Sequence, residues 1–435
     1  MSSHCCLPGV IDHAQQTAEF WIDRARGSED ILLDPEQIQA FNRRAMDIDP
    51  FLVDLAGYPR RMPGKEIERL ILSMSKEPAH PYHYRDGRRI EPADYDRYRA
   101  KLALSSIPDE KAVRFALVLE RADMRAWPTT YRAFTHHGDP HLDRFQENGL
   151  FPADAVAILH QSADGLWCFA QSYNYAAWVP AERLVPGDRE TILSYRKTPD
   201  FLVITGSRAS AERGASHDPV QLEMGVRLPL LNGESPFHGE KQQRLVTHHA
   251  IRLPVRNSEG GLAFDSALIE RSDDVREGYL PFSRANVLRQ AFKFLGEHYG
   301  WGHSENARDC TGFVSEVYKT MGILLPRNSW QQGQSRVGHN VRFAPDAPES
   351  DKIKTVLAAE PGDLLYSKGH VMIYLGEIDG EPYVIHDTAG AGRVEDDGTY
   401  HEGEYTGVSV TPLVSLHNSP DTSYLDEMYA VKQIR

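Results

Sequence analysis

The chain has 435 residues, more than one hydrophobic core usually holds, so we expect about three or four domains. Hydrophobic residues make up 41% of the chain, which excludes a largely disordered protein. With 48 basic and 62 acidic residues, the net charge of −14 argues against general binding to nucleic acid or anionic lipid. No run reaches the ~18 to 20 apolar residues of a membrane span, and the first residues lack the apolar core of a signal peptide, so we expect a soluble chain with no transmembrane segment.

Residues 1–105 are predicted to form a helical N-terminal region. Asp34 is placed to cap a helix that begins at Pro35, and Gln37 completes a capping box. A second amphipathic run spaces four apolar residues along one helix face. These are Ile67, Leu70, Ile71 and Met74.

Two small β-barrels are predicted next, over residues 106–187 and 188–262. Short runs rich in β-branched and aromatic residues alternate here with turn residues. The runs cover residues 115–119, 155–160, 167–171, 178–179, 201–205, 221–228 and 250–255. Two similar β modules in tandem are the simplest interpretation, although no repeat is visible residue by residue.

The last domain is expected over residues 263–435. Ser283 can cap a helix that runs through Leu295, and Gly296 is placed to end it. A glycine-containing loop then leads to a second helix that starts near Cys310 and closes at Gly322.

Four cysteines fit neither a disulfide framework nor a zinc spacing, so each is considered alone. They are Cys5, Cys6, Cys168 and Cys310. Cys168 lies in a strand-like run, where a buried inert thiol is expected. Cys310 is predicted at a helix N-terminus, where backbone N–H groups and the helix dipole favour a thiolate. It is therefore the candidate nucleophile.

A thiol nucleophile needs a histidine to take its proton, and two histidines stand in predicted strands downstream. A two-residue turn between those strands would put His370 and His386 on opposite faces of the hairpin. A three-residue loop over residues 378–380, with Gly380 in the left-handed conformation, puts them on one face. We therefore predict that loop, with His386 opposite Met372 and close enough to orient His370.

Several strings together resemble the NlpC/p60 cysteine peptidases of bacterial cell walls. They are Asp-Cys-Thr-Gly at 309–312, Gly-Ile-Leu-Leu-Pro-Arg-Asn-Ser at 322–329, Pro-Gly-Asp-Leu at 361–364, Gly-His-Val at 369–371 and Ile-His at 385–386, after a Trp-Gly loop at 301–302. Residues 121–128 resemble the first bacterial SH3-like (SH3b) module of multidomain members. The resemblance implies a multidomain α+β protein. Its papain-like catalytic domain would follow two SH3-like β-barrels and a helical N-terminal region.

That resemblance also implies an activity and its residues. The expected reaction is hydrolysis of the γ-D-glutamyl to diaminopimelate bond of peptidoglycan stem peptides such as L-Ala-γ-D-Glu-diaminopimelate, with no cofactor and no metal. Cys310, His370 and His386 inherit the roles of nucleophile, base and orienting residue. Tyr299 takes the place of a family tyrosine near the site, while Asp309 and Thr311 flank the nucleophile where some members bind a free L-alanine amine. Departures from the family pattern are Thr311 in place of serine and a shorter loop before Cys310.

Alternatives stay open for individual residues. Asp387, rather than His386, is a second candidate to orient the base, and Asp309 is equally suited to cap its helix. Asp363 is expected to be a turn acceptor. The histidine-rich stretch at 136–143 fits no compact metal-ligand template, so a solvated loop is favoured.

Alternatives also stay open for the whole chain. It could be a cell-wall-binding protein without hydrolytic activity, or an amidase or acyltransferase that uses the same thiol. A peptidoglycan substrate implies the cell envelope or periplasm, with an export signal absent from this chain. The lack of a signal segment suits the alternative of cytoplasmic recycling of wall peptides.

Overall fold

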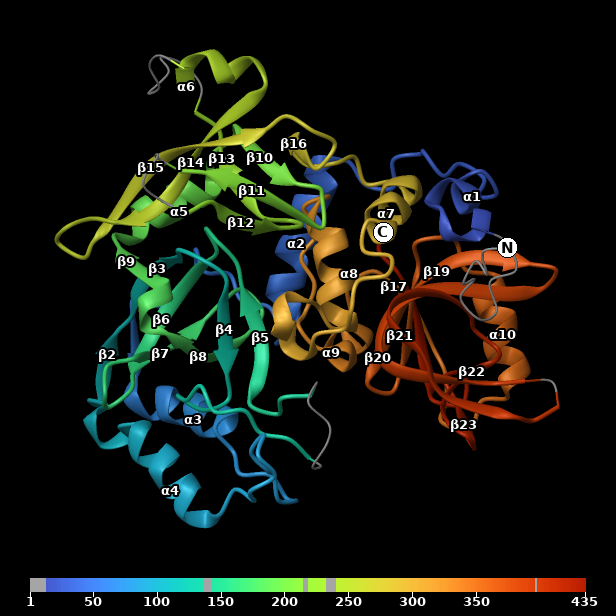
Figure 1. Ribbon diagram of the computed structural model, residues 1–435, viewed down its shortest axis with the longest axis horizontal. Helices are drawn as coiled ribbons and strands as arrows, with labels where there is room; N and C mark the ends of the chain where they lie inside the picture. Colours follow the sequence, from blue (N-terminus) through green and yellow to red (C-terminus); the bar gives the residue numbers. More distant parts are fainter. Residues whose placement is uncertain (1–12, 136–141, 214–217, 232–239, 396) are drawn as a thin grey trace. The chain divides into compact units, whose positions relative to one another are not determined.

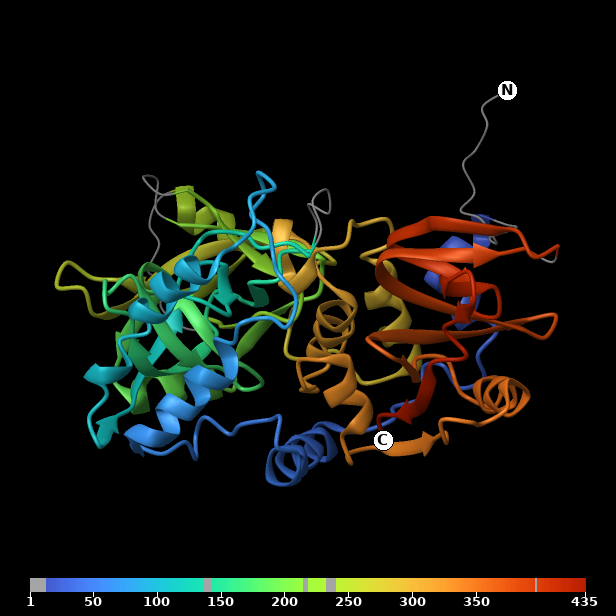
Figure 2. The ribbon, with the colours of Figure 1, turned by 90° about the horizontal axis from the view of Figure 1, so that it is seen from below.

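The computed structural model describes residues 13–135, 142–213, 218–231, 240–395 and 397–435, so the stretch 136–141 and Cys5 and Cys6 lie outside the described residues. The chain forms two compact units (Figures 1 and 2). Unit 1 comprises Met1–Phe51, Leu280–Gly300 and Glu305–Arg435, and unit 2 comprises Leu52–Tyr279 and Trp301–Ser304. The region expected over 1–105 is thus divided between the units.

Unit 1 is built on one antiparallel sheet in the order β17-β24-β18-β19-β20-β22-β23, with β21 also paired to β20. The strands are β17 (His339–Arg342), β18 (Leu364–Ser367), β19 (His370–Ile378), β20 (Glu381–Val394), β21 (Tyr400–Pro412), β22 (Leu416–Ser419), β23 (Thr422–Ser423) and β24 (Met428–Gln433). The helical elements are η1 (His13–Gln16), α1 (Ala18–Ile22), α2 (Pro35–Ile48), α7 (Arg284–Phe292), α8 (Cys310–Lys319), α9 (Ser329–Gln334) and α10 (Glu349–Leu357).

Helices cover this sheet on two sides. Figure 1 shows α7 and α8 on one side of the strands and α10 on the other. On the α10 side, Val356 packs with Met372 and Val384 in an apolar cluster. Because the sheet is covered on both sides, its central strands are apolar on both faces rather than alternating. Polar side chains such as His370 and His386 are therefore buried exceptions that require an explanation.

Local signals explain the start of two helices in unit 1. Asp34 and Gln37 form the predicted capping box of α2, with Pro35 as its first residue. Ser283 caps α7 as predicted, its side chain accepting from the backbone N–H of Asn286 at 3.2 Å. This helix ends at Phe292, earlier than the sequence predicted.

Unit 2 contains the helical elements α3 (Gly64–Met74), α4 (Pro92–Lys101), η2 (Leu104–Ser106), η3 (Ala181–Arg183), α5 (Arg189–Lys197), α6 (Glu240–Gln243) and η4 (Arg244–Val246). Its first β module is a sheet in the order β5-β4-β8-β7-β6-β3-β9, and β1 (Arg61–Pro63) pairs with β2 (Glu110–Ala112) beside it. The module's strands are β3 (Arg114–Val118), β4 (Ala122–Arg125), β5 (Gln146–Leu150), β6 (Ala155–Gln161), β7 (Trp167–Gln171), β8 (Ala176–Pro180) and β9 (Leu184–Gly187).

The second β module of unit 2 consists of two sheets, in the orders β13-β10-β16 and β12-β11-β15-β14. Its strands are β10 (Phe201–Ile204), β11 (Arg208–Glu212), β12 (Val220–Glu223), β13 (Arg227–Pro229), β14 (His248–Arg256), β15 (Leu262–Glu270) and β16 (Val275–Glu277). One apolar core includes residues of α3, α4 and both β modules.

Two expectations for the second β module are corrected by the structure. The run 221–228, predicted as one strand, is divided into β12 and β13 by a turn at Gly225, where φ is 79°. The domain boundary expected after residue 262 falls inside a hairpin, because β15 pairs with β14 along its whole length. The compact unit therefore continues to Tyr279.

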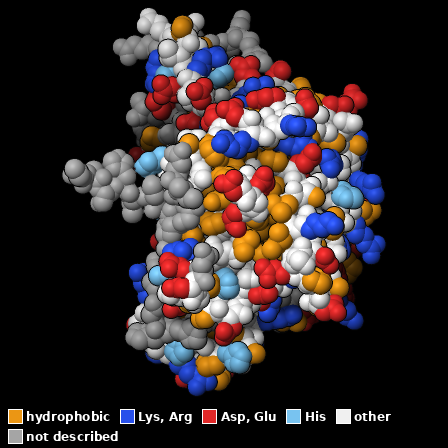
Figure 3. Space-filling model, turned by 90° about the vertical axis from the view of Figure 1, so that its right-hand side faces the viewer, with side chains coloured by type: hydrophobic (Ala, Val, Ile, Leu, Met, Phe, Trp, Pro, Cys, Tyr) orange, Lys and Arg blue, Asp and Glu red, His pale blue; other side chains and the backbone are white. Residues whose placement is uncertain are grey.

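No helix within the described ranges is long and apolar enough to cross a membrane. The face drawn in Figure 3 mixes acidic and basic side chains around a central group of apolar ones. No broad basic surface is visible on the part of that face that the structure describes.

Candidate active site

Cys310 is the first residue of α8, as the sequence predicted. Asp309 caps the helix, and its Oδ1 accepts from the backbone N–H of Gly312 at 2.8 Å. The cysteine is 7% exposed, and the backbone N–H of Val371 lies against its thiol. Because Val371 directly follows His370, the nucleophile lies against the start of β19.

The electrostatics of the thiol differ from the sequence-based expectation. Burial raises the pKa of Cys310, Asp309 and Asp387 raise it further, and the Val371 N–H and Arg327 act in the opposite direction. Lost solvation of the anion therefore opposes the thiolate that the helix N-terminus was predicted to favour. The direction of this shift favours a resting thiol that keeps its proton until a base takes it.

His370 is the first residue of β19, and His386 lies on the neighbouring strand β20. Nε2 of His370 is 2.8 Å from Nδ1 of His386, and the two rings are nearly perpendicular, at 80°. Both side chains are buried. The prediction that the two histidines share a face within hydrogen-bonding reach is confirmed.

The predicted cause of that shared face is wrong. Ile378 pairs with Glu381, so the loop has two residues instead of the predicted three. Asp379 and Gly380 form this turn with φ of 52° and 86°, both in the left-handed region. Continued without interruption, this register would put the two histidines on opposite faces.

An irregularity in β19 restores the shared face. The register shifts between Tyr374 and Gly376, where β19 carries one extra residue relative to β20. Beyond this bulge, Ile373 pairs with Ile385, which returns His386 to the face of His370. A bulge cannot be recognised from the alternation of residues alone, because both faces of this strand are buried.

The second nitrogen of His386 has its own partner. Nε2 of His386 is 3.0 Å from Oγ1 of Thr411 on β21. If His386 donates from Nε2 to Thr411, its Nδ1 is an acceptor for a hydrogen on Nε2 of His370. This tautomer leaves Nδ1 of His370 as the nitrogen that can take a proton. Sequence reasoning missed Thr411, since nothing local marks it as a partner of His386.

Burial favours the neutral form of both histidines. Burial lowers the pKa of His370 to about 3, with Asp309 acting in the opposite direction. Burial also lowers the pKa of His386 well below its usual value, and His370 adds to this. The resting site thus pairs a protonated thiol with neutral imidazoles, a combination suited to general-base activation of the thiol during attack.

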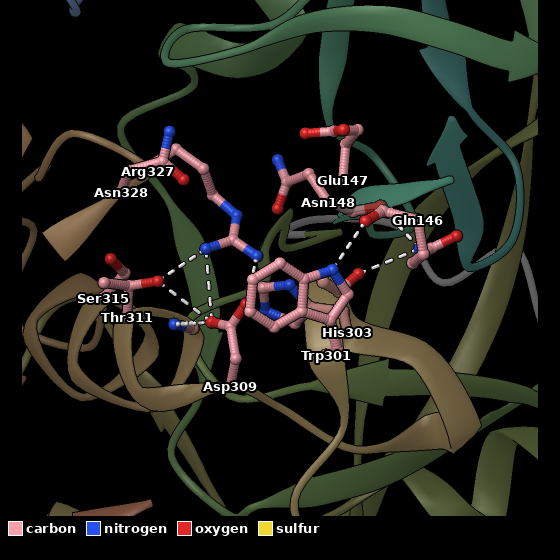
Figure 4. A network of polar contacts seen from close by, with 12 residues as sticks. Gln146, Glu147, Asn148, Trp301, His303, Asp309, Thr311, Ser315, Arg327 and Asn328 are labelled. Carbon is pink, nitrogen blue, oxygen red and sulfur yellow. Dashed lines mark hydrogen bonds and ion pairs between the residues drawn. The ribbon is translucent and has the colours of Figure 1, made fainter. Parts of the chain in front are cut away.

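Arg327 binds both residues that flank the nucleophile (Figure 4). Its Nη2 lies 2.6 Å from Oδ2 of Asp309, and its Nη1 donates to Oγ1 of Thr311 at 2.5 Å. Thr311 also donates to Oδ1 of Asp309 at 2.9 Å. All three side chains are buried. Arg327 belongs to the string at 322–329, but nothing in that string marks it as a partner of Asp309 and Thr311.

Tyr299 lies at the other side of the loop before the nucleophile, in a parallel bridge with Arg308. Burial raises the pKa of Tyr299, and the negative charge of Asp309 and the proximity of Cys310 add to this, which places the phenol near the nucleophile. Asp363 is the predicted turn acceptor, because its Oδ2 accepts from the backbone N–H of Glu360 at 2.9 Å.

The segment Trp301–Ser304 belongs to unit 2. Nε1 of Trp301 donates to the carbonyl of Gln146 at 2.9 Å, and Nε2 of Gln146 donates to the carbonyl of Gly302 at 2.9 Å (Figure 4). Gly302 has φ of 58°, and a Cβ there would lie 2.9 Å from the Gln146 side chain. A glycine is therefore required at this position.

Arg308 provides a stability test of the buried charges beside the nucleophile. It is 1% exposed and is 2.7 Å from Glu316 and 2.8 Å from Glu297. Arg308→Met leaves these acids without their buried cation, so we expect a loss of about 3–5 kcal/mol in the free energy of unfolding, measured by urea denaturation. The control Arg289→Met removes exposed pairs with Glu29 and Glu19 and should cost less than about 1 kcal/mol. Equal losses in the two variants would contradict this assignment.

A buried cysteine at a helix N-terminus, next to two hydrogen-bonded histidines on an antiparallel sheet, defines unit 1 as a papain-like α+β domain with a thiol–imidazole site. Comparison with known families agrees. The model of the NlpC/P60 family matches residues 296–413, and that of the SH3 domain (SH3b1 type) matches residues 131–180. The chain therefore contains an NlpC/P60 domain and an SH3b domain, which confirms the predicted family resemblance and fold class.

Curated relatives match parts of the chain. The "Probable endopeptidase p60" of Listeria seeligeri is 36% identical over 96 residues, which are 21% of this chain and 16% of the relative. The "Gamma-D-glutamyl-L-lysine dipeptidyl-peptidase" of Bacillus cereus is 25% identical over 215 residues, 47% of this chain and 54% of the relative. The matched regions thus span a sixth to about half of these relatives' lengths.

A solved structure resembles nearly the whole chain. It is described as a novel NlpC/P60 endopeptidase from Photobacterium damselae subsp. piscicida, and the match covers 96% of both chains with a TM-score of 0.74. Sequence identity is 16%, so this likeness shows a shared fold.

Proposed function

We propose that this chain is a cysteine peptidase of peptidoglycan that hydrolyses the bond between γ-D-glutamate and the diamino acid of stem peptides. The observation that carries the proposal is the hydrogen-bonded pair of His370 and His386 at the strand end against which the Cys310 thiol lies. The NlpC/P60 domain and the peptidase names of the relatives support the substrate class. Peptidoglycan as substrate makes the cell envelope the proposed place of action.

The first half of the reaction forms an acyl-enzyme. Nδ1 of His370 takes the thiol proton as Sγ of Cys310 attacks the γ-carbonyl carbon of D-glutamate. The tetrahedral intermediate collapses when the C–N bond breaks and His370 gives its proton to the leaving amine of the diamino acid. The products are a γ-glutamyl thioester on Cys310 and a free amine.

Water completes the cycle. His370 takes a proton from water as the water oxygen attacks the thioester carbonyl, and the departing sulfur recovers the proton. In both halves His386 holds the ring of His370 through the 2.8 Å contact at Nε2 and shares in stabilising the transient imidazolium. Thr411 fixes the tautomer of His386 in turn.

Recognition of a free L-alanine amine by Asp309, Thr311 and Tyr299 is part of the proposal. The carboxylate of Asp309 stands beside the nucleophile, where an ammonium group of the substrate would find a negative partner. Arg327 occupies both oxygens of that carboxylate, and Gly312 donates to one of them as well. An incoming amine must therefore share Asp309 with Arg327, so we expect recognition of the amine to depend on both residues.

Product analysis by mass spectrometry tests both the bond and the amine. The wild-type chain is incubated with L-Ala-γ-D-Glu-diaminopimelate and with the same peptide acetylated at its N-terminus. We expect release of L-Ala-D-Glu and diaminopimelate from the free peptide, with little cleavage of the acetylated one. Equal cleavage of the two would remove the amine-recognition claim and leave the peptidase. Cleavage at another bond, or transfer of the acyl group to an added amine, would reject the proposed reaction.

A further inference from the structure

Tyr424 packs against both histidines of the site. Its ring centroid is 5.1 Å from that of His370, at an interplanar angle of 72°, and 6.4 Å from that of His386, at 83°. Together with the perpendicular pair of histidines, this makes a group of three rings in which each meets the others edge to face. The side chain of Tyr424 is buried, at 7% exposure.

The backbone that carries Tyr424 is held on several sides. Ser367 Oγ donates to the carbonyl of Tyr424 at 2.7 Å, and the N–H of Tyr424 donates to the carbonyl of Leu416 at 3.0 Å. The buried ammonium of Lys352 on α10 donates to the carbonyl of the next residue, Leu425, at 2.8 Å. Contacts from β18, β22 and α10 thus fix the position from which the ring reaches the histidines.

Tyr424 also lies beyond the part of the chain that matches the family model, which ends at residue 413. The segment after that point forms β22, β23 and β24, and β24 inserts between β17 and β18 of the sheet. The residues that carry the expected chemistry all lie within 296–413. Tyr424 contacts two of these residues, His370 and His386, from outside the matched range, so the family match gives it no role.

We propose that Tyr424 is a positioning residue of the active site, whose ring fixes the plane of the His370 imidazole and keeps water from the pair of histidines. This inference rests on the proposed peptidase function. An imidazole that rotates freely presents Nδ1 to the thiol only part of the time. An aromatic ring packed against it limits this rotation and raises the fraction of time in which Nδ1 can take the thiol proton. His386 restrains Nε2 of His370, and Tyr424 restrains the ring's edge.

The proposal predicts an effect on pH dependence. Asp309 at the start of α8 acts on His370, Cys310 lies against the next residue, Val371, and His386 on β20 and Tyr424 contact the ring itself. Burial lowers the pKa of His370 to about 3, so the base is available in its neutral form down to acidic pH. Replacing the ring by a smaller side chain admits water, which stabilises the imidazolium and moves this pKa back toward its ordinary value.

Three variants of the full chain test the inference. Tyr424→Leu should lower kcat on the free tripeptide by roughly 10-fold or more with little change in KM, because orientation rather than substrate binding is lost. The acid limb of kcat/KM should rise by about one pH unit or more. Tyr424→Phe, which keeps the ring, should restore both quantities. Tyr429→Leu is the matched control, a tyrosine of the same segment whose ring contacts Tyr366 and neither histidine.

Alkylation of Cys310 by iodoacetamide gives a second readout that needs no substrate. The rate is followed against pH by mass spectrometry of the peptide that contains Cys310. Water admitted in Tyr424→Leu also stabilises the buried thiolate, so the pH of half-maximal alkylation should fall in Tyr424→Leu alone. If the wild-type chain cleaves no stem peptide, the proposed function fails while this shift still tests the inference. Wild-type profiles in Tyr424→Leu, or the same shift in Tyr429→Leu, would overturn it. Thermal unfolding of each variant separates lost folding from lost positioning.

Discussion

Replacing Cys310 with alanine should abolish hydrolysis of the stem peptide, with kcat/KM falling roughly 10⁴-fold or more. No other nucleophile in the site can form the thioester, and the change removes one sulfur atom from a buried helix terminus without disturbing the Asp309 cap. The expected protein is folded and binds substrate without turnover. Single-turnover assays with product detection by mass spectrometry measure the loss, and denaturation confirms the fold.

A second buried cysteine provides the control. Cys168 lies in β7 of unit 2, where burial raises the pKa of its thiol. His370 and His386 belong to unit 1. Cys168→Ala should leave turnover within about twofold of wild type, since only packing is changed. Retained hydrolysis in Cys310→Ala would reject the nucleophile and return weight to a cell-wall-binding protein without hydrolytic activity.

Replacing His370 with alanine is expected to lower kcat/KM by about 10³- to 10⁴-fold, because one residue supplies both the base and the acid of the cycle. Its loss also leaves the thiol with the high pKa that burial imposes. The pH of half-maximal alkylation of Cys310 should therefore rise in His370→Ala. The pH rises because burial raises the pKa of the Cys310 thiol, and without His370 no nearby group accepts its proton.

His386→Asn is the graded comparison for His370→Ala. Asparagine keeps an acceptor oxygen for Nε2–H of His370 but not the second imidazole, so the loss should be smaller, roughly 10- to 100-fold in kcat/KM. Equal losses in the two variants would show that His386 is as essential as the base itself. No loss in His386→Asn would assign the orienting role elsewhere, with Asp387, the buried neighbour on β20, as the alternative that the sequence left open.

Local structure was predictable wherever a few neighbouring residues decide it. The cap of α2 at Asp34 and Gln37 depends on contacts within four residues, and β7 follows from a short apolar run between turns. The placement of Cys310 behind Asp309 at the start of α8 is of the same kind. An error arose where a boundary depends on strand pairing, because Leu262, expected to end a domain, pairs with Arg256 in the hairpin of β14 and β15.

The histidine pair shows how a correct prediction can follow from a wrong local model. For His370 and His386 to share a face, the hairpin needs one residue more than a regular two-residue turn provides, and the sequence predicts that residue in the loop at 378–380. The chain places it in a bulge near Gly376, where the glycine has φ of 132° and the strand is buried on both faces. An extra residue in the loop or in the strand would put the two histidines on one face equally well, so only the folded sheet shows which of the two occurs.

The sequence by itself determined the family, the order of the modules, the helix that presents Cys310 and the two histidines that face it, because those signals lie in short strings and in their spacing. Tertiary structure alone decided the rest. Arg327 binds Asp309, Thr411 contacts His386 and Tyr424 packs against both histidines, each across 18 or more residues of sequence. Burial also opposes the thiolate that the helix N-terminus favours. Solvation and long-range packing depend on the whole fold, and no local pattern encodes them.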